Sequence, residues 1–141
     1  MIEARGLTKR YGKTTAVDDL TFEVRPGQVT GFLGPNGSGK STAMRLIMGL
    51  DASDAGTVRV NGRPYRDLVW PIREVSALLE AKAFHPGRSA SHHLTALAQT
   101  NAVPASRVDE VIDLVGRSGV AHRRAGKFSL GMGQRLGMAS A

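Results

Sequence analysis

The pattern with the clearest chemical meaning in this 141-residue sequence is a glycine-rich stretch at residues 34–42. It fits the form G-x-x-x-x-G-K-[ST] and consists of Gly34, Pro35, Asn36, Gly37, Ser38, Gly39, Lys40, Ser41 and Thr42. Its glycines allow the backbone to curl with the N–H groups inward, so that it forms a nest for an anion. The ammonium of Lys40 suits the β and γ phosphates of a nucleotide, and the Ser41 hydroxyl suits Mg²⁺. We therefore expect this loop to bind phosphate.

The elements predicted on either side decide between this interpretation and an ordinary glycine-rich turn. Residues 29–33 form a short apolar run that is typical of a buried strand. Residues 41–50 carry apolar side chains at helical spacing. A helix that begins at the loop directs its N-terminal dipole and its free N–H groups at the same phosphates. The order strand, loop, helix favours the phosphate-binding loop.

Further strands and helices are predicted along the rest of the chain. Alternation of apolar and polar residues predicts strands at 2–7 and 20–24, with a turn at 11–13. A strand at 57–60 is expected to enter a tight turn at Asn61-Gly62, and residues 75–79 resemble another buried strand. Helices are expected at residues 92–100 and 107–115, the second with Ser106 as its N-cap.

Composition limits the classes of partner. Lys and Arg number 19 against 12 for Asp and Glu, and the formal net charge of +7 favours anionic partners. Binding to nucleic acid would need a basic face interleaved with aromatic residues, which the sequence lacks, so no nucleic acid is expected. The absence of cysteine excludes disulfides and Cys-ligated zinc. No apolar run reaches the roughly 20 residues of a membrane span. The four histidines are expected at the surface or in loops.

The wording of residues 34–42 resembles the Walker A motif of the ATP-binding subunits of ATP-binding cassette (ABC) transporters, and the resemblance extends along the whole chain. Within residues 7–12, Tyr11 occupies the place where that family has an aromatic ring stacked on adenine. Judged by the residues alone, Tyr11 is more simply a half-buried aromatic of a hairpin. The resemblance implies an ATP site made of the Walker A residues and Tyr11, with Mg²⁺.

A second motif, at residues 128–135, resembles the signature motif of the same family, whose common wording is Leu-Ser-Gly-Gly-Gln. Ser129 and Gly131 hold the matching positions, whereas Leu130 and Met132 depart from the common wording in a form similar to that of antibiotic exporters. In the family this motif begins a helix and contacts the γ-phosphate held by the other subunit. The resemblance therefore implies catalytic roles for Lys40, Ser129 and Gly131 in a homodimer. Without Walker A upstream, residues 128–135 would be read as a loop before a helix.

Glu80 stands where the family has a glutamine that senses the γ-phosphate and Mg²⁺. A carboxylate can accept a contact from water or metal but cannot donate a hydrogen bond as an amide does. The resemblance thus implies Ser41 and Glu80 as metal-site residues. Residues 77–80 could instead be a degenerate Walker B strand, but in the family Walker B follows the signature motif. We therefore expect Walker B, its catalytic glutamate and the switch histidine beyond Ala141.

The resemblance also implies a fold and a cellular role. The expected fold is α/β, a P-loop NTPase core with an N-terminal antiparallel β layer and a helical subdomain, truncated at the C-terminus. Residues 1–80 would hold the β layer and the core, and residues 81–141 the helical subdomain. The expected function is that of a cytoplasmic ATPase subunit of an exporter, held at the inner face of the plasma membrane by a membrane-spanning permease subunit. The alternative is a truncated nucleotide-binding fragment that does not hydrolyse ATP.

Overall fold

The computed structural model describes residues 1–80, 84–116 and 118–141, and these form two compact units, Met1–Ala77 and Leu78–Ala141. The division falls slightly before residue 80, where the sequence had placed it. Each unit has its own cluster of buried apolar side chains. In neither unit do the described residues form a helix that is long and apolar enough to cross a membrane.

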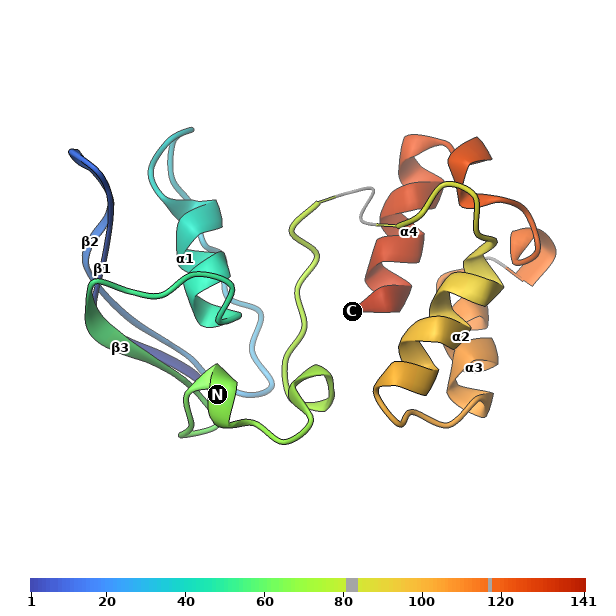
Figure 1. Ribbon diagram of the computed structural model, residues 1–141, viewed down its shortest axis with the longest axis horizontal. Helices are drawn as coiled ribbons and strands as arrows, with labels where there is room; N and C mark the ends of the chain where they lie inside the picture. The colour runs from blue at the N-terminus through green and yellow to red at the C-terminus, as the bar shows by residue number, and fades with distance from the viewer. Residues whose placement is uncertain (81–83, 117) are drawn as a thin grey trace. The chain divides into compact units, whose positions relative to one another are not determined.

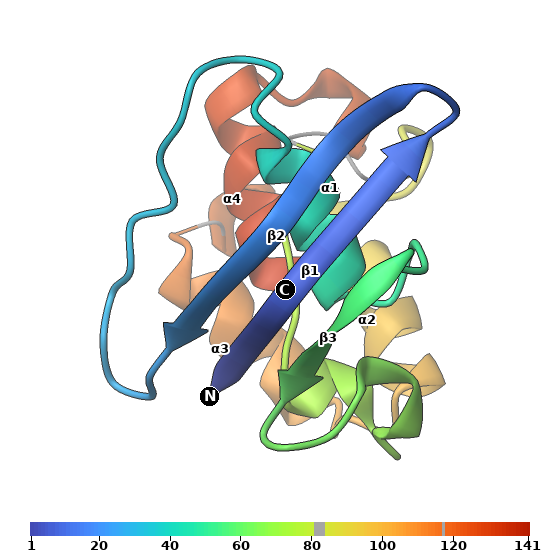
Figure 2. The ribbon, with the colours of Figure 1, turned by 90° about the vertical axis from the view of Figure 1, so that its left-hand side faces the viewer.

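The first unit is built on a three-stranded antiparallel sheet with the order β2-β1-β3 (Figures 1 and 2). Strand β1 (Ile2–Tyr11) lies in the middle and pairs with β2 (Thr14–Val24) and β3 (Ala55–Val60). The predicted hairpin is therefore present, with longer strands than the alternation indicated. Register shifts interrupt β1 near Gly6, whose φ of +59° marks a bulge.

Helix α1 (Lys40–Ile47) packs on this sheet through one face. Its Ala43 and Leu46 are buried with Ala4, Leu7 and Val17 of the strands. These contacts place the start of the helix beside the sheet, so the chain segment that enters the helix has a defined position. Two short 3₁₀ helices, η1 (Tyr65–Asp67) and η2 (Pro71–Arg73), follow β3 in the same unit.

The turn predicted at residues 61–62 is present. Val60 and Arg63 exchange backbone hydrogen bonds of 2.7 and 3.0 Å, and Asn61 and Gly62 both have positive φ, as a two-residue hairpin turn requires.

Two strand predictions were wrong. Residues 29–33 and 75–79 form no strand in the structure. An apolar strand of this kind is held by hydrogen bonds to neighbours on both sides, and among the described residues these segments pair with none. Val29 and Leu33 are consequently exposed. Phe32 packs against Phe22, with 5.6 Å between the ring centroids.

The second unit is helical. It contains α2 (Ala90–Thr100), α3 (Ser106–Leu114) and α4 (Leu130–Ser140), with short 3₁₀ helices η3 (Ser118–Val120) and η4 (Ala125–Lys127) between the last two. Its core draws on all three long helices, through residues such as Leu94, Ile112 and Leu136.

Two local predictions for this unit were also wrong. Helix α3 begins one residue early, so Ala105 stands at the N-cap and Ser106 does not cap it. His93 is buried on the core-facing side of α2, with its ring edge-on to Phe84 at 6.4 Å between centroids. Burial, followed by the nearby charge of Arg88, lowers the pKa of this imidazole, which therefore favours the neutral form.

Candidate nucleotide-binding site

The glycine-rich loop at residues 34–39 leads directly into α1, and its shape depends on glycine at particular positions. Gly37 and Gly39 have φ values of +84° and +81°, in the left-handed region that glycine adopts at little cost. At Gly34 the constraint is space, because a Cβ there would lie 2.6 Å from the Ser38 hydroxyl oxygen. The loop thus has the tight curl that its glycines predict.

Gly39 also allows the loop to lie in close contact with the sheet. A Cβ at this position would overlap the carbonyl oxygen of Ala16 on β2. Ala16 lies two residues along β2 from Thr14, the residue that pairs with Tyr11. The beginning of α1 therefore lies next to the end of the hairpin that carries Tyr11.

The start of α1 presents unpartnered backbone donors. In the part of the chain that the structure describes, no hydrogen bond engages the N–H groups of Gly37, Gly39, Lys40, Ser41 or Thr42. The last four are the donors that every helix leaves free at its N-terminus, where the helix dipole is positive. The first turn of α1 contains no acidic side chain that would compete for them. These groups are suited to bind an anion such as a phosphate.

The Lys40 ammonium lies across the same loop. Its Nζ donates to the carbonyl oxygens of Gly34 and Pro35, both at 2.6 Å, and lies 3.4 Å from the hydroxyl of Ser38. These bonds hold the positive charge at the loop, beside the free N–H groups. An oxyanion bound there would meet a cation and oriented amides together, which is the combination that phosphate groups require.

Tyr11 ends β1 and keeps about half of its surface, 49%, exposed. Its hydroxyl donates a 2.8 Å hydrogen bond to Asp51, which raises the pKa of Tyr11. The ammonium of Lys9 lies 5.3 Å from the ring centroid. A ring with a free surface at the hairpin end, near the start of α1, has the form needed to stack on a base.

Ser129 and Gly131 lie at the start of α4 in the second unit. The Ser129 hydroxyl caps the helix by accepting a 3.3 Å hydrogen bond from the N–H of Met132. A Cβ at Gly131 would meet nothing within 4 Å, so no contact of the described chain requires glycine there. The two residues thus form an open helix N-terminus.

The two residues expected at a metal site belong to different units. Ser41 is exposed in the first turn of α1, and Glu80 is exposed near the start of the second unit. Among the described residues no three His, Cys, Asp or Glu side chains form a group that could hold a metal. The single Ser41 hydroxyl nevertheless fits Mg²⁺, which usually takes few protein ligands and fills its sphere with water and phosphate oxygens.

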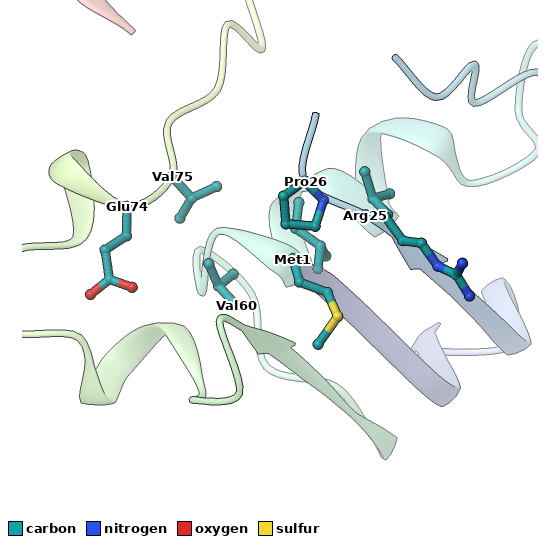
Figure 3. A pocket seen from close by; sticks show the side chains of 8 residues that line it. Met1, Arg25, Pro26, Val60, Glu74 and Val75 are labelled. Atoms are coloured by element: carbon teal, nitrogen blue, oxygen red, sulfur yellow. The ribbon is translucent and has the colours of Figure 1, made fainter. Parts of the chain in front are cut away.

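The first unit contains a cavity at one end of its sheet (Figure 3). It has a volume of about 160 Å³ and is lined by Met1, Ile2, Val24, Arg25, Pro26, Val60, Glu74 and Val75. Small-molecule pockets usually measure at least about 300 Å³. The cavity lies at the Ile2 end of β1, about 30 Å of strand from Tyr11 at 3.3 Å per residue. It is not the nucleotide site.

The sequence did not identify the residues that surround Tyr11. Asp51 follows α1 by a few residues and Arg45 lies in its last turn, and both belong to the network around the Tyr11 hydroxyl. Neither belongs to a motif, and an acidic residue 40 positions away from its tyrosine gives no periodic signal. The pairing of β1 with β3 and the packing of α1 on the sheet bring the two segments together.

Comparisons with known proteins show which family the chain is similar to. The ABC transporter family matches residues 17–141. An uncharacterised ABC transporter ATP-binding protein of Bacillus subtilis (strain 168), YhcH, is 36% identical over 99% of this chain and 46% of its own length. The bacitracin transport ATP-binding protein BcrA of Bacillus licheniformis is 34% identical over 100% of this chain and 47% of its own length. Other relatives are named as lantibiotic transport and as Fe(3+) import ATP-binding proteins.

The fold has a counterpart among solved structures. The ATP binding subunit of an ABC transporter superposes with a TM-score of 0.87 over 99% of this chain and 60% of that chain, at 23% sequence identity. The chain spans about half the length of the curated relatives it matches. The family match begins in β2 and continues to Ala141, so it covers most of the sequence, and the chain therefore belongs to the ABC transporter family.

Proposed function

We propose that this chain is part of the ATP-binding subunit of an ABC transporter and that it binds ATP through residues 34–42 and Tyr11. One observation carries the proposal. Five free N–H groups and the Lys40 ammonium lie together at a glycine-rich loop that contains no acidic side chain. Such a site matches the negative charge of a nucleotide's phosphate groups.

Each residue of the loop has a distinct role in this proposal. Lys40 exchanges its bonds to the carbonyls of Gly34 and Pro35 for phosphate oxygens. The free N–H groups of α1 bind the same phosphates, with Thr42 on the α-phosphate side. The Ser41 hydroxyl and the Glu80 carboxylate are the residues proposed to hold Mg²⁺, directly or through water. The bound metal would neutralise charge on the β and γ phosphates.

Ser129 and Gly131 are proposed to act on the nucleotide of a second subunit in a homodimer. The open N-terminus of α4 supports this role, since Gly131 has free space around it and a side chain there would narrow the approach. A hydroxyl and free amides at a helix start suit the γ-phosphate. Lys40, Ser129 and Gly131 are thus the proposed catalytic residues of the full-length protein.

The proposed partner is a membrane-spanning permease subunit, which would hold the protein at the cytoplasmic face of the membrane. Transport would be driven by ATP binding and hydrolysis. Export is proposed as the direction, supported by the wording of residues 128–135 and by Glu80 at the glutamine position, both similar to the antibiotic exporters.

A second candidate function is that of a fragment that binds ATP but does not hydrolyse it. The observation in its favour is that this chain spans about half of its curated relatives, while residues 29–33 pair with no other described segment. The two candidates share the same ATP site and differ only in hydrolysis.

The test of ATP binding is a titration of the chain and of its Lys40→Ala variant, for example by calorimetry. We expect the variant to lose measurable ATP binding, because its phosphate site loses the only side-chain ammonium within the motif. Lys127→Ala removes the same charge from the second unit and should bind ATP as the native chain does. Equal affinities of the native and Lys40→Ala chains would contradict the proposal.

A further inference from the structure

The end of α1 has a fixed geometry that returns the chain toward the helix. Gly49, with a φ of +63°, donates its N–H to the carbonyl of Leu46 at 3.1 Å. The N–H of Leu50 donates to the carbonyl of Arg45 at 2.9 Å. This pair of bonds is the usual way in which a left-handed glycine ends a helix. The chain that leaves the turn therefore runs back beside the last turn of α1.

Asp51 is the residue that this turn brings next to Arg45. The guanidinium donates from Nε to Oδ2 at 2.8 Å and from Nη2 to Oδ1 at 3.2 Å, so both carboxylate oxygens are bound. A two-point pair of this kind fixes the orientation of the carboxylate and not only its position. Arg45 thus orients Asp51.

The oriented carboxylate reaches strand β1. The Tyr11 hydroxyl donates to Oδ2 of Asp51 at 2.8 Å. The hydrogen bond from Arg45, followed by that from Tyr11, lowers the pKa of Asp51 to about 2, while the bond to Asp51 raises the pKa of Tyr11. Near neutral pH, Asp51 is therefore a charged acceptor and Tyr11 a neutral donor, so the bond persists.

A second residue of the hairpin, Lys9, also contacts the ring of Tyr11. The ammonium of Lys9 lies 5.3 Å from the centroid of the Tyr11 ring, as in a cation–π contact. Lys9 is itself paired with Asp54 at 3.6 Å, and Asp54 also accepts a 2.6 Å hydrogen bond from the N–H of Arg10. With Lys9 near the ring, the hydroxyl bound to Asp51 and 49% of the residue exposed, the exposed part of the ring is the surface left for a ligand.

We infer that Asp51, oriented by Arg45, is a positioning residue for nucleotide binding, because it fixes the ring of Tyr11 before the base arrives. This rests on the proposed function, since it takes Tyr11 to stack on adenine. Helix α1 then bears Lys40 at its start and, through Arg45 and Asp51, determines the orientation of Tyr11 from its end. A ring ordered in advance spares the cost of immobilising it, which corresponds to about 2- to 10-fold in affinity.

The experiment compares binding of ATP with binding of inorganic tripolyphosphate, which has no base. We expect Asp51→Ala to weaken ATP binding by about 2- to 10-fold and to leave tripolyphosphate binding nearly unchanged. Tyr11→Phe removes only the hydroxyl and should have a similar effect, whereas Tyr11→Ala, which loses the stacked ring, should lose about 5- to 150-fold. Asp18→Ala, which removes an exposed carboxylate from β2, is the matched control. It should not change the affinity for ATP relative to the affinity for tripolyphosphate.

The double variant separates positioning from a structural effect. If Asp51 acts through the Tyr11 hydroxyl, Asp51→Ala should have little further effect on ATP binding in a Tyr11→Phe background, since the two changes break the same bond. Equal losses for ATP and tripolyphosphate, or losses that multiply in the double variant, would overturn the inference. Failure of the proposed function is distinct from this, because ATP binding would then be absent or independent of Lys40.

Discussion

Two glycines of the phosphate loop show that glycine is needed there for two different physical reasons. Gly37 and Gly39 have nearly the same backbone, with φ of +84° and +81°. A Cβ at Gly37 would meet nothing within 4 Å, whereas a Cβ at Gly39 would overlap the Ala16 carbonyl. The first glycine is required by its conformation alone, and the second by its conformation and by its contact with β2.

This difference predicts unequal costs of substitution. Gly37→Ala should lower the free energy of unfolding by about 1–2 kcal/mol, the cost of placing a residue with a Cβ in the left-handed region. Gly39→Ala should lower it by more, because the loop must also move away from β2. Urea unfolding of the two variants measures both values. Equal losses would show that the contact with Ala16 contributes nothing.

At the scale of elements, those with local signals could be predicted from the sequence. The hairpin of β1 and β2, the turn at residues 61–62 and the helices α1 to α4 all follow from periodicity, turn residues or a motif. The predictions of these elements were wrong at the ends, as in the N-cap of α3, because the position of an end depends on a few competing hydrogen bonds.

Features that depend on distant partners could not be predicted in this way. Residues 29–33 have the composition of a buried strand, but a strand also needs neighbours, and the described chain supplies none. The bond between Tyr11 and Asp51 joins residues 40 positions apart and depends on the pairing of β1 with β3 and on the turn that ends α1. The loop was therefore predictable as a motif, while the support of Tyr11 was not.

Helix α4 gives a prediction at this scale. Ser129→Ala removes the oxygen that caps the helix and should lower the stability of the second unit by about 1 kcal/mol. Ser129→Asn keeps a capping oxygen and should unfold at nearly the native denaturant concentration. Circular dichroism during denaturation compares the two. If Ser129→Asn were as unstable as Ser129→Ala, the hydroxyl would have a role other than capping.

At the scale of the whole molecule, the question is what 141 residues can do when their curated relatives are about twice as long. Phosphoryl transfer needs a positioned water and a metal held by a Walker B aspartate as well as by the loop hydroxyl, and residues 1–141 contain no Walker B motif. We expect the purified chain to bind ATP with Mg²⁺ and to release phosphate no faster than the Lys40→Ala variant. Lys40-dependent phosphate release above that background would contradict this expectation.

The two buried clusters have a consequence for protein engineering. The cluster around Leu7 and Leu46 draws on the first unit alone, and the cluster around Leu94 and Leu136 draws on the second alone. A crossover placed between Ala77 and Leu78 therefore cuts through neither cluster. Chimeras that exchange residues 78–141 between relatives at this junction should keep each set of packed side chains intact, so the helical part can be shuffled as a module.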